Sequence, residues 1–226
     1  MQLNADFSQR VSVHAVTMGW KASPMPGVDR RMLDRLGDEV ARATTIVRYA
    51  PESKFSPHVH TGGEEFFVLE GIFQDEHGDF PAGSYIRNPP DSSHTPGSTA
   101  GCTIFVKLWQ FDMADRSHVR IDTNKMAFVA DVERNGVEVL PLFHDDREDV
   151  CLERWAADTT IDLVAPDGME ILVLDGTFTE EGEAFARQSW LRMPRNSSSQ
   201  AKVGAKGARV WIKRGHLAEE PQPPAV

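Results

Sequence analysis

The sequence predicts an all-β protein made of two β-barrels in series, and two observations support this fold class. First, the apolar stretches are short, rich in β-branched and aromatic residues, and separated by Gly, Pro, Asp and Ser roughly every 8 to 15 residues. This pattern is typical of short antiparallel strands in a sandwich or barrel. Second, the whole pattern occurs twice along the chain, which indicates two copies of the same structural unit.

The repeat is visible in matching segments that follow one another in the same order. FFVLEGIFQDEHGDF at 66–80 returns as EILVLDGTFTEEGEAF at 170–185, and both contain a Val-Leu-acid-Gly-x-Phe core. SYIRNPPDSS at 84–93 returns as SWLRMPRNSS at 189–198, with the same offset of 105 residues. Two further pairs have an offset of 106: TTIVRYA (44–50) with VCLERWA (150–156), and TIFVK (103–107) with RVWIK (209–213). The chain is therefore a tandem duplication of a unit of about 105 residues.

The predicted strands of the first unit follow from these apolar stretches: TTIVRYA (44–50), EFFVLEGIF (65–73), GSYIRNPP (83–90) and CTIFVKLWQF (102–111). The earlier segment VDRRMLDRLG (28–37) has apolar residues at helical spacing, but its repeat partner VEVLPLFHDD carries a proline in its middle. Because proline breaks a helix, a strand and a turn are favoured there. The boundary is expected near 115–130, giving domains of residues 1–120 and 121–226, and EEPQPPAV at the end of the sequence is expected to be frayed.

Composition and charge restrict the class of protein. A formal net charge of −10 disfavours nucleic-acid binding, which needs a basic surface. No apolar stretch approaches the roughly 18 residues of a membrane helix, and the polar start MQLNADFSQR lacks the features of a signal peptide. The two cysteines, Cys102 and Cys151, lie outside any CxxC pair, which predicts neither a disulfide framework nor a thiolate zinc site. We expect a soluble, acidic protein of the cytoplasm, a monomer or a loose homodimer.

The stretch PHVHTGGEEFFVLEG, at 57–71, concentrates possible metal ligands. On a strand, His58 and His60 point to the same face, and a turn at Thr61-Gly62-Gly63 brings Glu64 back beside them. Imidazole and carboxylate ligands suit zinc, iron, manganese and nickel alike. Glu65 is a rival carboxylate one residue further on. His94, in the proline-rich turn NPPDSSHTPGS, is the candidate for a further ligand from elsewhere in the same barrel.

These motifs resemble those of the cupins. HVHTGGEEFFVLEG is similar to the first cupin motif, HxH(x)3-4E(x)6G, in which six residues after Glu64 lead to Gly71, and PAGSYIRNPPDSSH at 81–94 is similar to the second. GGEEFFVLEGIFQDEHGDFPAGSYIRNPP and GCTIFVKLWQ resemble more closely the ChrR-like cupins, the metal-binding domain of an anti-sigma factor group. The resemblance implies two tandem cupin domains, each a jelly-roll β-barrel or double-stranded β-helix. It implies zinc, most readily, held by His58, His60, Glu64 and His94.

The second unit lacks this ligand set. At an offset of 105 residues the four ligand positions fall on Leu163, Ala165, Met169 and Ser199, which cannot hold a metal ion in the same way. One metal ion per chain is therefore expected. The second barrel is predicted to be a degenerate cupin that serves packing or a partner, with an apolar ligand pocket as the alternative. The remaining histidines are predicted to be surface or core residues: His14, His77, His118, His144 and His216.

Two functions follow from the resemblance. The favoured one is a regulatory protein whose metal-stabilised cupin senses a small molecule or binds a regulatory partner. Anti-sigma factors of this group also carry a His-x3-Cys-x2-Cys zinc motif, and residues 1–40 contain no cysteine, so sigma binding is not expected. The alternative is a metal-dependent dioxygenase or isomerase that acts on a small carbonyl compound. No acid, base or nucleophile is evident, although Tyr85, Arg87 and Trp109 could line the barrel.

Overall fold

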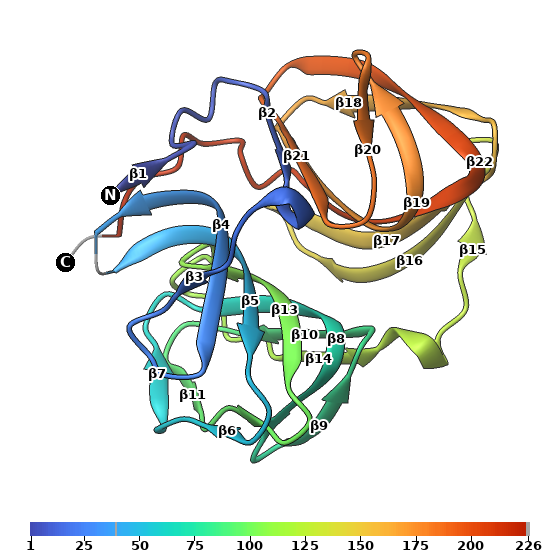
Figure 1. Ribbon diagram of the computed structural model, residues 1–226. Helices are drawn as coiled ribbons and strands as arrows, with labels where there is room; N and C mark the ends of the chain where they lie inside the picture. The colour runs from blue at the N-terminus through green and yellow to red at the C-terminus, as the bar shows by residue number, and fades with distance from the viewer. Residues whose placement is uncertain (39, 225–226) are drawn as a thin grey trace. The chain divides into compact units, whose positions relative to one another are not determined.

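The computed structural model describes residues 1–38 and 40–224, and within them the regular structure is β except for two short 3-10 helices, η1 (Ala15–Thr17) and η2 (Thr123–Lys125). The all-β prediction is therefore confirmed (Figure 1). In the described part of the chain, no helix has the length and apolar character needed to cross a membrane.

Two compact units make up the chain, and each contains one antiparallel barrel. The first unit comprises Met1–Ala5, Gly19–Lys125 and the C-terminal residues from Gln222; the second comprises Asp6–Met18 and Met126–Pro221. The predicted domains 1–120 and 121–226 are continuous in sequence, whereas the structure assigns a short N-terminal segment to the second unit.

The first unit contains a main sheet with the strand order β1-β4-β5-β13-β8-β10-β14, and β7 and β11 form a separate pair. Strands β6, β9 and β12 continue the sheet from the second half of β8, which is the arrangement of a jelly roll. Its strands are β1 (Gln2–Leu3), β3 (Lys21–Ala22), β4 (Val28–Gly37), β5 (Ala41–Tyr49), β6 (Ser53–Lys54), β7 (His58–His60), β8 (Glu64–Asp75), β9 (Gly78–Pro81), β10 (Ser84–Asn88), β11 (Ser92–His94), β12 (Gly97–Ser98), β13 (Cys102–Leu108) and β14 (Val119–Asp122).

The second unit repeats this topology with the order β15-β16-β17-β22-β19-β21-β2. Its strands are β2 (Val11–His14), β15 (Val129–Ala130), β16 (Val137–His144), β17 (Asp149–Trp155), β18 (Thr160–Ala165), β19 (Met169–Glu180), β20 (Glu183–Phe185), β21 (Ser189–Met193) and β22 (Ser197–Arg214). Strands β4 and β16 replace the helix that the spacing of residues 28–37 allowed, as the proline in the repeat indicated.

The edge strand of the second barrel comes from the beginning of the chain. Strand β2 pairs with β21, and its partner in the repeat, β14, pairs with β10 of the first barrel. The two registers are equivalent, because Val11 is opposite Arg192 and Val119 is opposite Arg87. Each barrel therefore has as its edge strand the segment that precedes the other barrel in the sequence.

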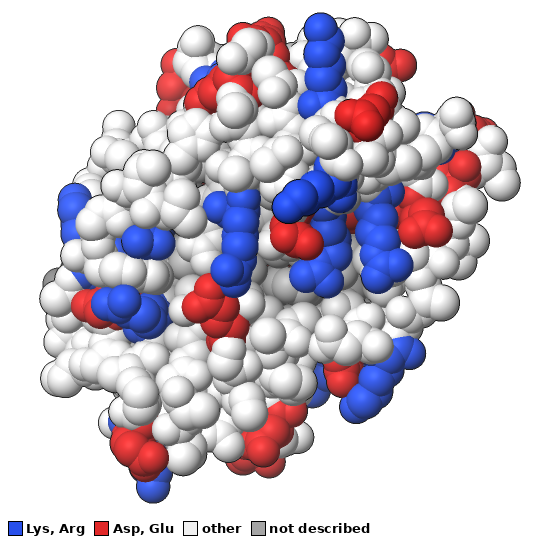
Figure 2. All heavy atoms as spheres, turned by 45° about the vertical axis from the view of Figure 1, so that its right-hand side comes forward, with Lys and Arg blue, Asp and Glu red and all other residues white. Residues whose placement is uncertain are grey.

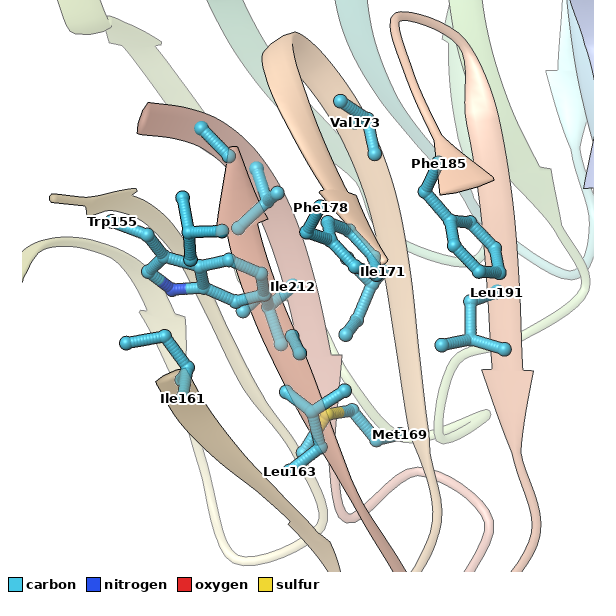
Figure 3. Close-up of a cluster of buried hydrophobic side chains, with 14 of the residues drawn as sticks. Trp155, Ile161, Leu163, Met169, Ile171, Val173, Phe178, Phe185, Leu191 and Ile212 are labelled. Atoms are coloured by element: carbon cyan, nitrogen blue, oxygen red, sulfur yellow. The ribbon is translucent and has the colours of Figure 1, made fainter. Parts of the chain in front are cut away.

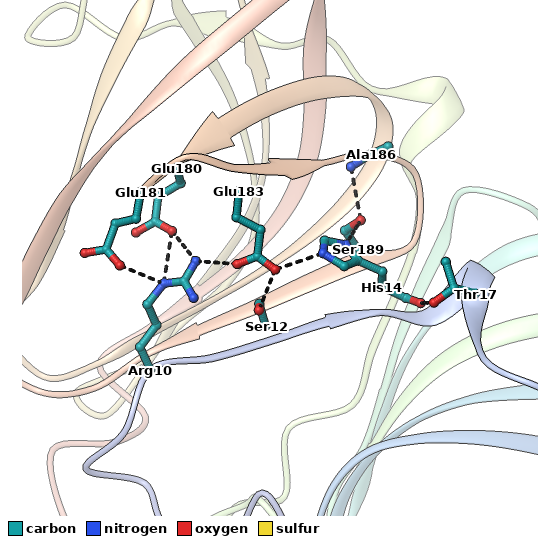
Figure 4. A network of polar contacts seen from close by, with 9 residues as sticks. All are labelled: Arg10, Ser12, His14, Thr17, Glu180, Glu181, Glu183, Ala186 and Ser189. Atoms are coloured by element: carbon teal, nitrogen blue, oxygen red, sulfur yellow. Dashed lines mark hydrogen bonds and ion pairs between the residues drawn. The ribbon is translucent and has the colours of Figure 1, made fainter.

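Polar side chains reinforce the attachment of β2 to the second barrel (Figure 4). Arg10 contacts the carboxylates of Glu180 and Glu183, with 2.9 Å between its Nη2 and Glu183 Oε2. His14 Nε2 lies 2.9 Å from Glu183 Oε1, and His14 Nδ1 lies 2.9 Å from Ser189 Oγ. These contacts fix the strand by side chains as well as by its backbone.

A glycine bends β8 and β19, the equivalent strands of the two repeats. Gly71 in β8 and Gly176 in β19 have φ of 72° and 73°. A Cβ atom at Gly71 would lie 2.0 Å from Gly101 O, and one at Gly176 would lie 2.1 Å from Gly207 O. Only glycine fits both the left-handed backbone and the close approach. The glycine of the repeated Val-Leu-acid-Gly-x-Phe core thus turns the strand from one part of the barrel to the next.

Both barrels have apolar interiors. Trp155, Phe178 and Ile212 lie within the interior of the second (Figure 3). In the first barrel, Phe66, Val68 and Ile104 belong to a buried apolar cluster.

The molecular surface carries both signs of charge. Lys and Arg side chains lie beside Asp and Glu side chains on the face shown in Figure 2. Exposed ion pairs such as Arg116 with Asp91, at 3.2 Å, contribute to this mixture. On that face the charge is mixed, and a purely basic surface of the kind that nucleic acid requires does not occur there.

Candidate metal centre

The β7–β11 pair brings the three predicted histidines together. His58 and His94 are direct cross-strand partners, and His60 lies two residues along β7 on the same face. The turn after β7 closes with a hydrogen bond from Gly63 N to His60 O. Gly62 is required in this turn, because a Cβ there would lie 2.0 Å from the ring of Trp109. Trp109 therefore packs under the turn and supports it.

The ligand atoms form a compact group. One nitrogen of each of His58, His60 and His94 lies within 4.8 Å of the others. His60 Nε2 and His94 Nε2 are 3.0 Å apart. Glu64 Oε2 lies 3.4 Å from His60 Nε2 and 3.7 Å from His94 Nε2. The structure thus brings the three predicted histidines together and places Glu64 beside His60 and His94.

The two neighbouring glutamates point in different directions. Glu64 faces the histidines and accepts a hydrogen bond of 3.3 Å from Asn88 Nδ2. Glu65 accepts a hydrogen bond of 2.6 Å from the Tyr85 hydroxyl, and Arg87 lies 3.9 Å from it. Successive residues of a strand face opposite sides of the sheet, so only Glu64 can join the histidines. Tyr85 and Arg87 are buried and contact Glu65.

Burial differs sharply among the four side chains. His60, Glu64 and His94 are buried, whereas His58 is exposed. Burial lowers the pKa of His60, so its imidazole is neutral and able to bind a metal ion at neutral pH. Burial also acts to lower the pKa of His94, but its hydrogen bond to Asp75 and the charge of Glu64 outweigh this effect and raise it. The group is therefore enclosed on one side and open to solvent at His58.

The donor set suits a first-row transition metal ion, and the spacing of His60, His94 and Glu64 is close to that of ligands on one ion. Ligand atoms at about 2.0–2.2 Å from such an ion lie about 2.9–3.5 Å from one another. The separations of 3.0 and 3.4 Å at His60 fall within this range, and 3.7 Å between His94 and Glu64 is just outside it. Three imidazoles and one carboxylate are also a suitable ligand set chemically.

Three further residues surround the site and were not selected from the sequence. Asp75, at the end of β8, contacts His94 Nδ1 at 3.2 Å, and Asn88 contacts Glu64. Burial raises the pKa of Tyr49 on β5, and the nearby charge of Glu64 raises it further, so this phenol stays protonated close to the site. Asp75 and Asn88 contact the ligands from strands other than β7 and β11, so only the strand register could have revealed them.

In the second barrel the corresponding positions are part of the core. Leu163 is opposite Ser199 in the β18–β22 pair, as His58 is opposite His94. Leu163, Ala165 and Met169 are buried in the hydrophobic cluster of this barrel, where Leu163 and Met169 lie side by side (Figure 3). Apolar packing thus occupies the place that the metal ligands occupy in the first barrel.

The fold and the site define a cupin-type protein: a jelly-roll barrel with a cluster of histidines that can hold a metal ion. Residues 8–112 match the family model described as the ChrR cupin-like domain. This part of the chain is thus similar to the ChrR cupin-like domain, as the motifs indicated, and the second barrel repeats the strand order of the first. A comparison with curated protein sequences finds no significant match.

Solved structures support the fold over nearly the whole chain. A proposed dioxygenase from Nostoc punctiforme is 17% identical with a TM-score of 0.77, over 97% of this chain and 87% of that one. A proposed glyoxylate-induced protein from Pseudomonas aeruginosa is 13% identical with a TM-score of 0.73, over 100% and 94%. A variant of oxalate decarboxylase from Bacillus subtilis is 8% identical with a TM-score of 0.63, over 90% and 76%. At these identities the likeness concerns the fold alone.

Proposed function

We propose that the first barrel binds one divalent metal ion through His58, His60, Glu64 and His94, and presents it to a small molecule. Zinc is the ion we expect, and iron, manganese or nickel would suit the same ligands. The observation that carries this proposal is the uneven burial of the ligands. Three are enclosed, but the exposed ring of His58 leaves the ion open to solvent on one side.

A coordination position left to water or substrate separates a catalytic metal site from a structural one, and beside four side-chain ligands this position requires an ion that takes five or six ligands. Because the site is open at His58, we propose a metal-dependent enzyme, acting on a small carbonyl compound as a dioxygenase or isomerase. The bound ion would supply Lewis acidity, or redox chemistry if it is iron or manganese. The protein residues have distinct tasks: His60 and His94 hold the ion from inside the barrel, and Glu64 balances its charge. The phenol of Tyr49 is a hydrogen-bond donor near Glu64 that a bound oxygen-containing molecule could use.

Metal content and turnover test this proposal. Purified protein should contain metal, and after exchange into zinc, iron, manganese or nickel it should convert members of a panel of small diketones and aromatic ketones under oxygen. In a matched variant, His58→Ala, turnover should fall more than metal content does. Two buried histidines and Glu64 remain to hold the ion. Protein that binds metal with all positions filled by side chains, and that converts none of the panel with any of the four ions, would contradict an enzymatic role.

A regulatory role is the second candidate, and the match of residues 8–112 to the ChrR cupin-like domain favours it. In this case the metal would stabilise a domain that changes its partner contacts when a small molecule binds. The sequence contains two cysteines, Cys102 and Cys151, both buried, so the thiolate zinc motif of the anti-sigma factors is not available within it. A regulator should bind ligand at the metal without converting it, which the same panel would reveal as a shift in melting temperature without product.

A further inference from the structure

The two ring nitrogens of His94 face different partners. Nε2 lies among the proposed ligands, 3.0 Å from His60 Nε2. Nδ1 lies 3.2 Å from Asp75 Oδ2, and both side chains are only 2% exposed. A neutral imidazole carries one proton, so a proton on Nδ1 leaves Nε2 free to bind an ion. The carboxylate of Asp75 can only accept, which makes Nδ1 the protonated nitrogen.

Asp75 is itself held in place. Its other oxygen, Oδ1, accepts a hydrogen bond of 2.7 Å from the backbone N–H of His77. The next residue, Glu76, accepts a hydrogen bond of 2.8 Å from Thr95 N, next to His94. The ring of His94 also lies against Phe73, with 5.7 Å between the ring centroids. The end of β8 therefore contacts the end of β11 at His94 through several side chains.

The second barrel has a carboxylate at the position equivalent to Asp75, but it has no histidine at the position equivalent to His94. Glu180 ends β19 as Asp75 ends β8, at an offset of 105 residues. Where His94 has been replaced by Ser199, the carboxylate of Glu180 instead contacts Arg10 of the segment that leads into β2. A carboxylate at this point contacts a histidine only in the barrel that has the ligands.

We propose that Asp75 is the positioning residue of the metal centre, which fixes His94 as the Nδ1–H tautomer and turns Nε2 toward the ion. This inference rests on the metal site proposed above. Histidine ligands commonly donate their second N–H to a carboxylate or carbonyl, which orients the ring and strengthens the ligand. His58 has the weaker arrangement, with Nδ1 lying 3.2 Å from the backbone carbonyl of Ser56. Of the two cross-strand ligands, His94 is thus the one held by a charged partner.

The geometry makes an unusual prediction for Asp75→Asn. The amide oxygen must face His77 N–H, so the amide NH2 group must face His94 Nδ1 and donate to it. The proton of His94 then moves to Nε2, the wrong nitrogen for binding. Asp75→Ala imposes no tautomer. The isosteric Asn variant should therefore bind metal more weakly than the Ala variant, whereas a role limited to filling space would give the reverse order.

The test combines two measurements at a pH above the raised pKa of His94, where this imidazole is neutral. Long-range 1H–15N spectra of the metal-free protein should show His94 with a proton on Nδ1 in the wild type and on Nε2 in Asp75→Asn. Zinc affinity, measured by competition with a chelator, should fall about 10- to 100-fold in Asp75→Asn and less in Asp75→Ala. The control Asp79→Asn removes an exposed carboxylate that bonds to Gln74 and should retain wild-type affinity.

Each failure has its own meaning. Wild-type affinity in Asp75→Asn, or tighter binding by Asp75→Asn than by Asp75→Ala, would overturn the positioning role. If the variants do not fold, the wild-type spectrum alone decides, because a proton on Nε2 of His94 would overturn it as well. Wild-type protein that takes up no metal would instead contradict the proposed function, and the tautomer of His94 would still report on Asp75.

Discussion

His60, Glu64 and His94 lie buried next to one another, which costs free energy unless their polar atoms are paired. Asp75 pairs with Nδ1 of His94, and Asn88 donates to Oε2 of Glu64, the oxygen that also faces the histidines. Nε2 of His60, Nε2 of His94 and Oε2 of Glu64 point toward the centre of the group and lie 3.0 to 3.7 Å from one another. A bound cation would be coordinated by these atoms, which would stabilise the arrangement. Metal should therefore contribute to the stability of the first barrel.

Substitution of His60 by alanine tests this contribution. His60→Ala removes a buried ligand, so the metal content should fall and the protein should lose the stabilisation that a bound ion gives, about 2.7 kcal/mol when the free metal is at 100 times its dissociation constant. Thermal melting with and without added zinc, together with elemental analysis, measures both effects. His144→Ala, at an exposed histidine in the second barrel, should behave as the wild type. Unchanged metal content in His60→Ala would show that the ligand assignment is wrong.

Glu153 is a buried charge of a different kind. Its Oε1 accepts hydrogen bonds from Arg134 at 2.8 Å and Arg214 at 2.7 Å, and its Oε2 accepts one from Trp155 at 2.6 Å. Burial acts to raise the pKa of Glu153, but the two arginines outweigh it and lower the pKa below the ordinary value of 4.5. The folded state therefore favours the ionised form more than the unfolded state does. The resulting stability is present above pH 4.5 and is lost as the pH falls through the folded-state pKa.

We expect Glu153→Gln to destabilise the second barrel by about 1–3 kcal/mol near neutral pH, since it leaves the half-buried Arg134 and Arg214 short of a partner. The difference from the wild type should shrink as the pH falls below 4.5. Denaturant unfolding over a series of pH values measures this dependence. Glu138→Gln, which removes the partner of Arg154 in an exposed pair, should cost less than about 1 kcal/mol at any pH. A constant difference between wild type and Glu153→Gln across the series would contradict the assigned charge state.

Among the structural elements, the strands β8 and β19 each depend on a single glycine for their bend. Gly71 and Gly176 bend them where another backbone approaches within contact distance. Gly71→Ala should destabilise the first barrel by more than about 1 kcal/mol, because alanine fits neither the positive φ nor the space. Gly19→Ala is the matched control, since a Cβ there meets nothing within 4 Å. Equal melting temperatures for the two variants would contradict this role of the bend.

The strands differ in how far the sequence predicts them. The strands around Phe66 and Val173 were predictable, because β-branched and aromatic residues between turn residues recur in both repeats. The histidines and Glu64 were predictable because three of them lie on one short stretch and His94 belongs to the second motif, although His94 ends strand β11 and does not lie in a turn. Asp75 was not, because its contact with His94 depends on how β8 and β11 meet. The exchange of β2 was not predictable either, since four half-buried residues, VSVH, carry no sign of which barrel they join.

For the whole molecule, the duplication and the loss of ligands set the metal stoichiometry. The second barrel keeps the strands of the first but has Leu163, Ala165, Met169 and Ser199 at the ligand positions. We expect about one tightly held metal ion per chain, measured by elemental analysis of the purified protein. Two tightly held ions per chain would contradict the assignment of a single site.

The exchange of edge strands makes a prediction about fragments of the chain. A fragment of residues 1–115 lacks β14, so the edge of β10 is free, and it lacks β21, so β2 has no partner. The vacant edge and the unpaired strand match, because β2 sits on β21 in the register that β14 has on β10, with His14 opposite Ser189 and Asp122 opposite Ser84. In a pair of fragments each β2 could occupy the β10 edge of the other copy. We therefore expect fragment 1–115 to form a dimer by reciprocal strand exchange.

Two related fragments test whether β2 and the free β10 edge cause the association. Fragment 1–125 retains β14 on the β10 edge, and fragment 19–115 has no β2, so neither should form the exchanged dimer. Light scattering coupled to size-exclusion chromatography gives the mass of each fragment, and circular dichroism confirms that each is folded. A folded, monomeric 1–115 fragment, or a 19–115 fragment that dimerises equally well, would contradict the exchange. The full chain should remain a monomer or a loose dimer in the same measurement, because it supplies both edge strands itself.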